Sequence, residues 1–263
     1  MRLIDTHCHL AGSRLRQQAP QVLLRARQAG VEAVVCAAAS VQESAAALAL
    51  AGEHPEVYCT AGVHPHEAKN AGVGYLQALA KLAEGPRNVA IGEIGLDYHY
   101  NYSPPPDQRQ AFAEQLELAR RLGKPVVIHT RQAFEDTMAI LAASGLDGGR
   151  VLFHSFTEGP AAVRRVLDLG ATVSFSGIVT FSSAAEVQQA AGLTPQDRLL
   201  VETDAPYLSP EPVRKMKTNE PANVAYVAAF LARLRHADPE GLAEATTANA
   251  RRFFGLDTAR SDE

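Results

Sequence analysis

His7 and His9 are the first residues of the chain whose type and spacing suit metal chemistry, and they closely follow the apolar residues Leu3 and Ile4. Residues two apart on a β-strand point to the same side, so both imidazoles can face one cation. Such a pair could equally be hydrogen-bonded at the protein surface, because short motifs often match by chance. The choice between these readings depends on the rest of the chain.

Later segments repeat the same form, in which a short apolar run ends in His, Glu or Asp. The expected ligands are His7, His9, Glu93, His129, His154 and Asp204. Parallel strands present their carboxyl ends at one mouth of a barrel, so these six side chains are expected to converge there. Glu93 lies in an apolar, glycine-flanked run, where a carboxylate is costly to bury unless a cation neutralises it. The alternative partner is a salt bridge to Arg131.

Two divalent ions fit six ligands better than one, since a single catalytic ion takes three or four protein ligands. Glu93, in the middle of the strand order, is the natural bridge between them. Nitrogen and oxygen ligands without thiolate suit zinc, manganese or magnesium, and the number of imidazoles argues against magnesium alone. Cys8 should point to the side opposite His7 and His9, so it is not expected to be a ligand.

Apolar runs and helical periodicities alternate along the chain. Strands are expected over residues 2–4, 31–39, 57–63, 89–92, 125–128, 150–153, 171–175 and 199–201. Helices are expected over residues 20–30, 41–51, 74–84, 108–122 (capped by Asp107), 134–143, 160–169, 184–191, 224–235 and 242–254. This pattern predicts an α/β fold, a single (β/α)8 TIM barrel domain over residues 1–263 with its site at the carboxyl ends of the strands. The polar tail 257–263 is expected to be frayed, and segment 206–221 to be a loop over the site.

The composition limits the classes of protein that fit. The chain has 263 residues, 46% of them hydrophobic, which is enough for one barrel core. Its formal charge of -4 provides no global attraction for long nucleic acid, so any such binding must rely on local charge or on metal ions. Three irregularly spaced cysteines suit reduced thiols. We see no signal peptide or membrane span and no sign of an obligate protein partner, and we expect a cytoplasmic location.

Six short motifs, in chain order, resemble those of the TatD-type metal-dependent deoxyribonucleases of the amidohydrolase superfamily. They are DTHCH at 5–9, GVHPH at 62–66, GEIGLD at 92–97, IHTR at 128–131, FHSF at 153–156 and ETDAPY at 202–207. The resemblance extends from Leu3 to about Phe254. It implies one ion on His7, His9, Glu93 and Asp204, and another on Glu93, His129 and His154. It also implies a nuclease that trims DNA single strands or ends in the 3′-5′ direction.

Asp204 and Glu93 are the expected catalytic residues. Two ions can activate a water for attack on phosphorus, and Asp204 is placed to orient that water and accept its proton, while Glu93 bridges the ions. Glu202 is expected to support a ligand from behind.

Four further residues are candidates for binding the substrate. His64 and His66 could contact the phosphate or a third, weaker ion, or could simply form a turn with Pro65. Arg131 and Lys217 could bind backbone phosphates, or could be solvated surface charges.

Two other functions remain possible from the sequence. The same scaffold could hydrolyse other substrates, as a D-aminoacyl-tRNA deacylase or a small-molecule amidohydrolase does, because barrel and metals do not fix the substrate. Many amidohydrolases bridge their metals with a carboxylated lysine, whereas Glu93 stands in that place here, which favours the nuclease branch. A metal-dependent scaffold protein without activity would be expected to have a broken ligand set, and this set is complete.

Overall fold

Parallel strands form one eight-stranded sheet in the computed structural model, which describes residues 1–256. Each strand pairs with the next in chain order. They are β1 (Leu3–Cys8), β2 (Val31–Cys36), β3 (Val57–Ala61), β4 (Asn88–Asp97), β5 (Val126–Arg131), β6 (Val151–Phe153), β7 (Thr172–Phe175) and β8 (Leu199–Val201).

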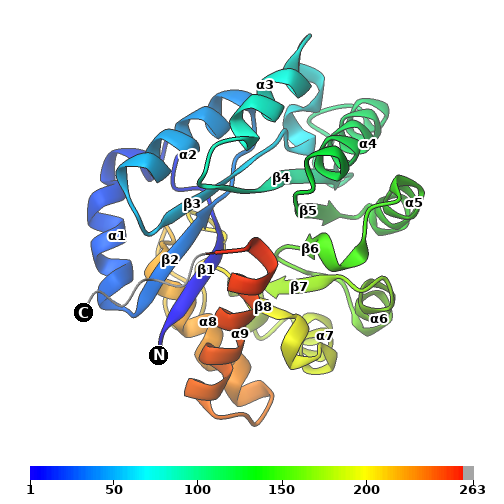
Figure 1. Cartoon of the computed structure of the whole chain (residues 1–263). Helices are drawn as coiled ribbons and strands as arrows, with labels where there is room; N and C mark the ends of the chain where they lie inside the picture. The colour runs from blue at the N-terminus through cyan, green and yellow to red at the C-terminus, as the bar shows by residue number, and fades with distance from the viewer. Residues whose placement is uncertain (257–263) are drawn as a thin grey trace.

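Helices surround the strands, as Figure 1 shows. They are α1 (Ala19–Gln28), α2 (Val41–Glu53), α3 (Tyr75–Ala83), α4 (Pro105–Leu122), α5 (Phe134–Ser144), α6 (Pro160–Asp168), α7 (Ala185–Leu193), α8 (Val224–Leu234) and α9 (Pro239–Phe254). Apolar residues at helical spacing form the face that each helix buries; α4, for example, buries Phe112, Leu116 and Ala119. Among residues 1–256, every helix is too short or too polar to cross a lipid bilayer.

The two edges of the sheet meet just beyond β8. Cys8 and Ala205 form a parallel bridge, in which His9 N donates to the Ala205 carbonyl at 2.7 Å. Asp204 N donates to the His7 carbonyl at 2.9 Å. These bonds bring β8 beside β1 and confirm the predicted barrel, and they also place the backbone of Asp204 next to His7.

One end of the barrel is filled by apolar side chains. A buried cluster joins residues from several strands to the last helix, namely Ile4, Ala33, Val35, Ala90, Val127, Leu152, Leu200, Ala250, Phe254 and Leu256. Since the last three belong to α9 and the residues directly after it, this helix covers the amino-terminal end of the strands. The polar side chains of the interior line a cavity at the carboxyl end of the strands.

The structure corrects several expected element boundaries; for example, β1 and β5 extend beyond the expected residues 4 and 128, so that His7 and His129 lie inside their strands. The strand expected over 89–92 extends to Asp97, so Glu93 lies inside β4 and not at its end. Gly95 permits this extension, because its φ is 137° and a Cβ there would lie 2.0 Å from the His129 carbonyl oxygen of β5. Helix α4 begins at Pro105, so Asp107 lies in its first turn and does not cap it. Helix α9 begins at Pro239, capped by Asp238. The expected frayed tail 257–263 lies outside the described residues.

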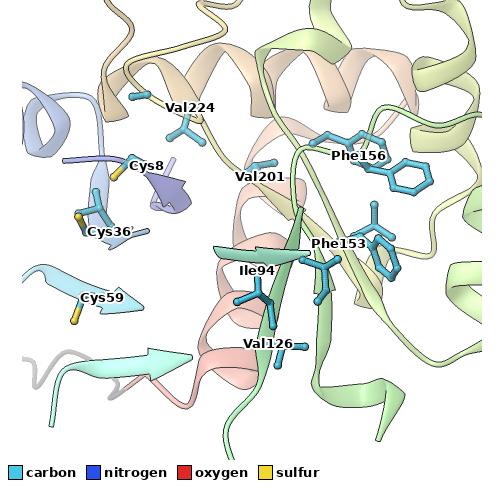
Figure 2. Packing of buried hydrophobic residues seen from close by; sticks show 14 of the residues in the cluster. Cys8, Cys36, Cys59, Ile94, Val126, Phe153, Phe156, Val201 and Val224 are labelled. Atoms are coloured by element: carbon cyan, nitrogen blue, oxygen red, sulfur yellow. The ribbon is translucent and has the colours of Figure 1, made fainter. Parts of the chain in front are cut away.

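The outer layer of the core lies between the strands and the helices, and Figure 2 shows part of it. Cys8, Cys36 and Cys59 sit there on the neighbouring strands β1, β2 and β3. The Cys8 thiol donates to the Val35 carbonyl at 3.7 Å. Cys8 thus points into this apolar layer, as the alternation of strand side chains predicts.

Candidate metal centre

The carboxylate of Glu93 lies at the centre of a group of histidines, and its first oxygen faces three of them. Oε1 is 2.8 Å from His129 Nδ1, 2.8 Å from His154 Nε2 and 3.3 Å from His64 Nε2. Strands β4 and β5 and the start of the segment after β6 supply Glu93, His129 and His154. This side of Glu93 corresponds to the second of the two expected ion sites.

The second oxygen of Glu93 faces the other expected ligands. Oε2 is 3.3 Å from His7 Nε2 and 3.5 Å from His9 Nε2. Asp204 Oδ1 lies 3.5 Å from His9 Nε2 and 3.9 Å from His7 Nε2. Asp204 has a φ of 55°, a conformation that is unfavourable for a residue with a side chain and is held by the hydrogen bond of its N–H to His7. The other five expected ligands therefore gather around the carboxylate of Glu93.

Two buried atoms of this group indicate that the protein groups alone do not satisfy it. Within residues 1–256, Glu93 Oε2 and His7 Nδ1 have no hydrogen-bond partner. Glu93 is only 2% exposed, and a buried carboxylate oxygen without a partner is costly. A cation held near His7, His9 and Asp204 would neutralise this oxygen, and the nitrogen and oxygen donors suit zinc or manganese.

Charge coupling shifts the protonation equilibria of the group. Burial alone would raise the pKa of Glu93, but the neighbouring imidazoles outweigh it and hold that pKa well below its usual range. Burial likewise opposes the charged form of His154, yet Glu93 and Glu202 raise its pKa well above the usual value. Burial is again outweighed at His9, where Asp204 and Glu93 raise the pKa to about 9. Glu93 is thus ionised at neutral pH and available to a cation.

Asp97 belongs to the same group of side chains, although no role was predicted for it from the sequence. Its Oδ2 lies 3.0 Å from His129 Nε2 and 3.1 Å from His66 Nε2, and the side chain is almost fully buried. Its Oδ1 accepts the backbone N–H groups of His99 and Tyr100 at 3.0 and 2.9 Å. A signal was present, because residues four apart on a strand share a face, so an aspartate four residues after Glu93 should reach the same mouth.

Two buried carboxylates support the ligands from behind. Glu202 Oε1 lies 3.2 Å from His154 Nδ1, and its other oxygen accepts a hydrogen bond from the Ser174 hydroxyl. Glu202 thus contacts the ring of His154, and its supporting role stays a prediction. Asp5, which the sequence reading did not single out, accepts both the N–H and the hydroxyl of Thr203, at 2.8 and 2.6 Å. It thereby ties the segment that carries Asp204 to β1.

His64 and His66 lie beside the Glu93 group but differ in what they offer. His64 Nδ1 accepts the backbone N–H of His66 at 3.1 Å, so a neutral His64 carries its proton on Nε2, toward Glu93. Burial lowers the pKa of His64 to about 4, which keeps the ring neutral. His64 therefore presents a hydrogen-bond donor to the site. His66 is held by Asp97 at the rim.

The four candidates for substrate binding line two adjoining cavities. His64, His66 and Arg131 line a cavity of about 1150 Å³ above Glu93. The guanidinium of Arg131 lies over the ring of Tyr100, 4.8 Å from its centre, while Glu93 faces imidazoles, so the alternative salt bridge between Arg131 and Glu93 is wrong. Lys217 lines a smaller pocket of about 380 Å³ next to that cavity.

Comparison with known proteins agrees with this geometry. Residues 4–255 match the family of TatD-related DNases. The chain is similar to the uncharacterized metal-dependent hydrolase YcfH of Escherichia coli K12 (41% identity, covering 99% of this chain and 98% of that one). It is also similar to the 3'-5' ssDNA/RNA exonuclease TatD of Rahnella sp. (39% identity, 98% and 100%). The crystal structure of the TatD homologue YJJV of Escherichia coli K12 superposes with a TM-score of 0.90 (30% identity, 97% and 99%). The chain belongs to the TatD-related DNase family of metal-dependent hydrolases.

Proposed function

We propose that the protein is a metal-dependent nuclease that releases nucleotides from the 3′ end of single-stranded DNA. The observation that carries the proposal is the division of the Glu93 carboxylate, whose two oxygens face two separate ligand groups. His7, His9 and Asp204 would hold one divalent ion and His129 and His154 the other, with Glu93 shared between them. Ions bound there would lower the pKa of a water and offset the charge of the phosphate oxygens.

The residues around this centre would accept the proton of the water, bind the phosphate and orient the ligands. Asp204 is ionised, because His9 and His7 outweigh the effect of burial and lower its pKa, so it can accept the proton of the attacking water. His64 points its Nε2–H toward the centre and would donate a hydrogen bond to the phosphate. Asp97 and Glu202 hold the rings of His129 and His154 in one orientation.

The shape of the cavity and the named activity of a relative support a polynucleotide substrate. A volume of about 1150 Å³ exceeds what one small molecule fills, and the cavity is lined by Arg14, Arg16 and Arg131 although the whole chain is acidic. The Rahnella relative is named as an exonuclease of single-stranded DNA and RNA. Local cations and exposed aromatic rings suit a single strand better than an extended duplex.

The direct test uses metal-depleted protein, single strands and duplexes labelled at the 3′ or the 5′ end, and manganese, magnesium or zinc added separately. We expect stepwise loss of the 3′ label and shortening of 5′-labelled single strands in manganese. Circular single strands should resist digestion. Nicking of circles at a similar rate would exclude an exonuclease, and hydrolysis of only an aminoacyl ester or a small amide would exclude a nuclease.

A further inference from the structure

Two aromatic platforms stand on opposite sides of the metal centre. On the His66 side, Tyr100 and Tyr102 stack with ring centres 5.2 Å apart and planes within 13°. They remain 45% and 57% exposed although they line the cavity. Arg131 lies over Tyr100, and His66 contacts Tyr102 edge-on with ring centres 4.8 Å apart. This group, which we call the Tyr102 platform, presents aromatic surface to solvent.

The second platform is the ring of Tyr207, on the side of His9. Its centre lies 5.9 Å from that of His9, and the guanidinium of Arg14 lies 5.4 Å from it. Tyr207 is 49% exposed. Asn219 holds this segment in place, since its side-chain amide donates to the carbonyls of Tyr207 and Thr203 at 2.7 and 3.0 Å.

The two sides differ in what lies beyond the platform. Past Tyr207, the smaller pocket continues from the main cavity and shares Arg14 and Tyr207 with it. Arg214 and Lys217 line this pocket, and Arg214 is stacked on Phe181, 3.9 Å from the ring centre. Arg214 also lies 3.8 Å from Glu211, in an ion pair that is weak because both side chains are about half exposed. Cations thus continue outward from the metal centre along this side.

The side of the Tyr102 platform has fewer cations in the cavity lining than the Tyr207 side. Arg109 is held by the carboxylate of Asp136 at 3.1 Å, and Asp136 also accepts the hydroxyl of Tyr98 at 2.7 Å. Lys69 is exposed and its backbone N–H donates to Ser103, the residue after Tyr102, but its side chain does not line the cavity. Among the residues that line the two cavities, the side of the Tyr102 platform thus offers stacking for a base and one cation, Arg131, whereas the Tyr207 side offers Arg14, Arg214 and Lys217.

We propose that the strand crosses the centre in one direction, with the base of the 3′-terminal nucleotide on the Tyr102 platform and the upstream strand over Tyr207 and along Arg14, Arg214 and Lys217. The inference rests on the proposed function and adds the orientation of its substrate. A terminal nucleoside needs a stacking surface and no further phosphate contacts, whereas the upstream strand brings one phosphate per nucleotide and is stabilised by consecutive cations.

The first test varies the length of the substrate. The only phosphate of a dithymidylate must occupy the metal centre, while a decathymidylate also reaches the cations beyond Tyr207. We expect Arg214→Ala to reduce kcat/KM at least about fivefold more for the decamer than for the dimer. The slope of log affinity against log salt should fall by about 0.7, the value for one phosphate contact of a single strand. The matched control is Arg120→Ala, an exposed arginine in the last turn of α4 at the other end of the barrel.

The second test pairs protein variants with substrates that lack one base. Tyr102→Ala should weaken the binding of a normal decamer by about 5-fold to 150-fold, the usual range for one stacked base, and Tyr102→Phe should restore it. This loss of affinity should vanish when the 3′-terminal nucleotide of the decamer lacks its base. It should persist when an upstream nucleotide lacks its base instead. Tyr207→Ala should weaken binding of a decamer with an abasic 3′ end, but should have no effect when the upstream nucleotide over Tyr207 is abasic.

Binding is measured by fluorescence anisotropy with manganese-loaded protein and a decamer whose last linkage is a phosphorothioate, so the result does not depend on cleavage. Coupling of the terminal base to Tyr207, or an Arg214→Ala effect no larger than that of Arg120→Ala, would overturn the inference. If the terminal base depends on Tyr102 and an upstream base on Tyr207, but neither oligonucleotide is hydrolysed, the proposed function is wrong and the proposed orientation is still supported.

Discussion

Asp97 and His129 form a pair in which the carboxylate determines which nitrogen of the imidazole carries the proton. Asp97 Oδ2 lies 3.0 Å from His129 Nε2, and the opposite ring nitrogen lies 2.8 Å from Glu93 Oε1. An ionised carboxylate can only accept, so it favours the proton on Nε2 and leaves a lone pair on Nδ1 for a metal ion. The low pKa of Asp97, to which His129 and His66 contribute against the effect of burial, keeps it ionised.

Asp97→Asn should therefore weaken metal binding without unfolding the protein. The asparagine amide can place a donor opposite Nε2 and favour the wrong tautomer, and loss of such a supporting carboxylate typically costs about 10-fold to 100-fold in metal affinity. We expect activity to recover at high manganese. Calorimetric titration of manganese together with turnover measures both effects; unchanged manganese affinity would show that His129 does not depend on Asp97.

Glu93→Gln should remove most of the activity and lower the number of bound ions from two to at most one. A neutral amide is a poor bridge, and it leaves the surrounding imidazoles without their central charge. Metal content after gel filtration and turnover at saturating manganese give the readouts. Glu43→Gln is the matched control, because this carboxylate lines the same cavity but accepts the backbone N–H of Ala39. Turnover of Glu93→Gln equal to that of the control would exclude the bridging role.

Removal of the metal should leave a protein that loses stability as the pH rises above about 6.5. His9 has a raised pKa of about 9, so its stabilising effect is complete below the unfolded-state value near 6.5 and is lost as the pH rises toward 9. His64 has a lowered pKa of about 4, so its own contribution to stability increases as the pH rises from 4 to 6.5, whereas burial raises the pKa of Asp5 to about 8 and makes the contribution of Asp5 fall over that range. The melting temperature of chelator-treated protein, measured from pH 5 to 9, tests these contributions to stability. A melting temperature that does not change with pH would contradict the shifted pKa values of the two histidines.

Much of the fold could be predicted because each strand and helix has a local cause. Buried parallel strands are continuous apolar runs, and helices have apolar residues every three or four positions. The alternation of these two patterns along the chain predicted the barrel, and with it the end of the barrel where the ligands meet. The extent of β4 could not be predicted, since it depends on Gly95 approaching the backbone of β5. The contacts of the two His129 nitrogens with Glu93 and Asp97 could not be predicted either. Spacing along the chain shows which side chains share a face, but it does not show which ring atom faces which carboxylate.

Gly95→Ala tests the backbone requirement directly. A side chain at a φ of 137° costs on the order of 1–3 kcal/mol, and the added Cβ would also collide with the His129 carbonyl, so we expect a larger loss of unfolding free energy than that. Gly145→Ala is the matched control, since its φ is also positive, at 66°, but a Cβ would meet nothing within 4 Å. Urea unfolding compares the two; equal losses would mean that the close approach is tolerated.

Asp204→Asn should separate chemistry from metal binding. The side chain lies beside His9 and His7 at the mouth, across the Glu93 carboxylate from His129 and His154, so it borders the place where the attacking water must lie. Asparagine keeps the size and one oxygen but cannot accept a proton at neutral pH. Loss of a general base costs on the order of 100-fold to 10,000-fold in rate, and added metal does not restore it.

The measurement is turnover of Asp204→Asn as a function of manganese concentration, with the melting temperature as a control for folding. The ion on Glu93, His129 and His154 should remain bound, because none of its ligands is changed. We expect a reduced plateau rate that further manganese does not raise, since a weakened ligand and a missing base respond differently to metal. Recovery to near the unsubstituted rate at high manganese would show that Asp204 serves only as a ligand, and the proton would then have to leave by another group.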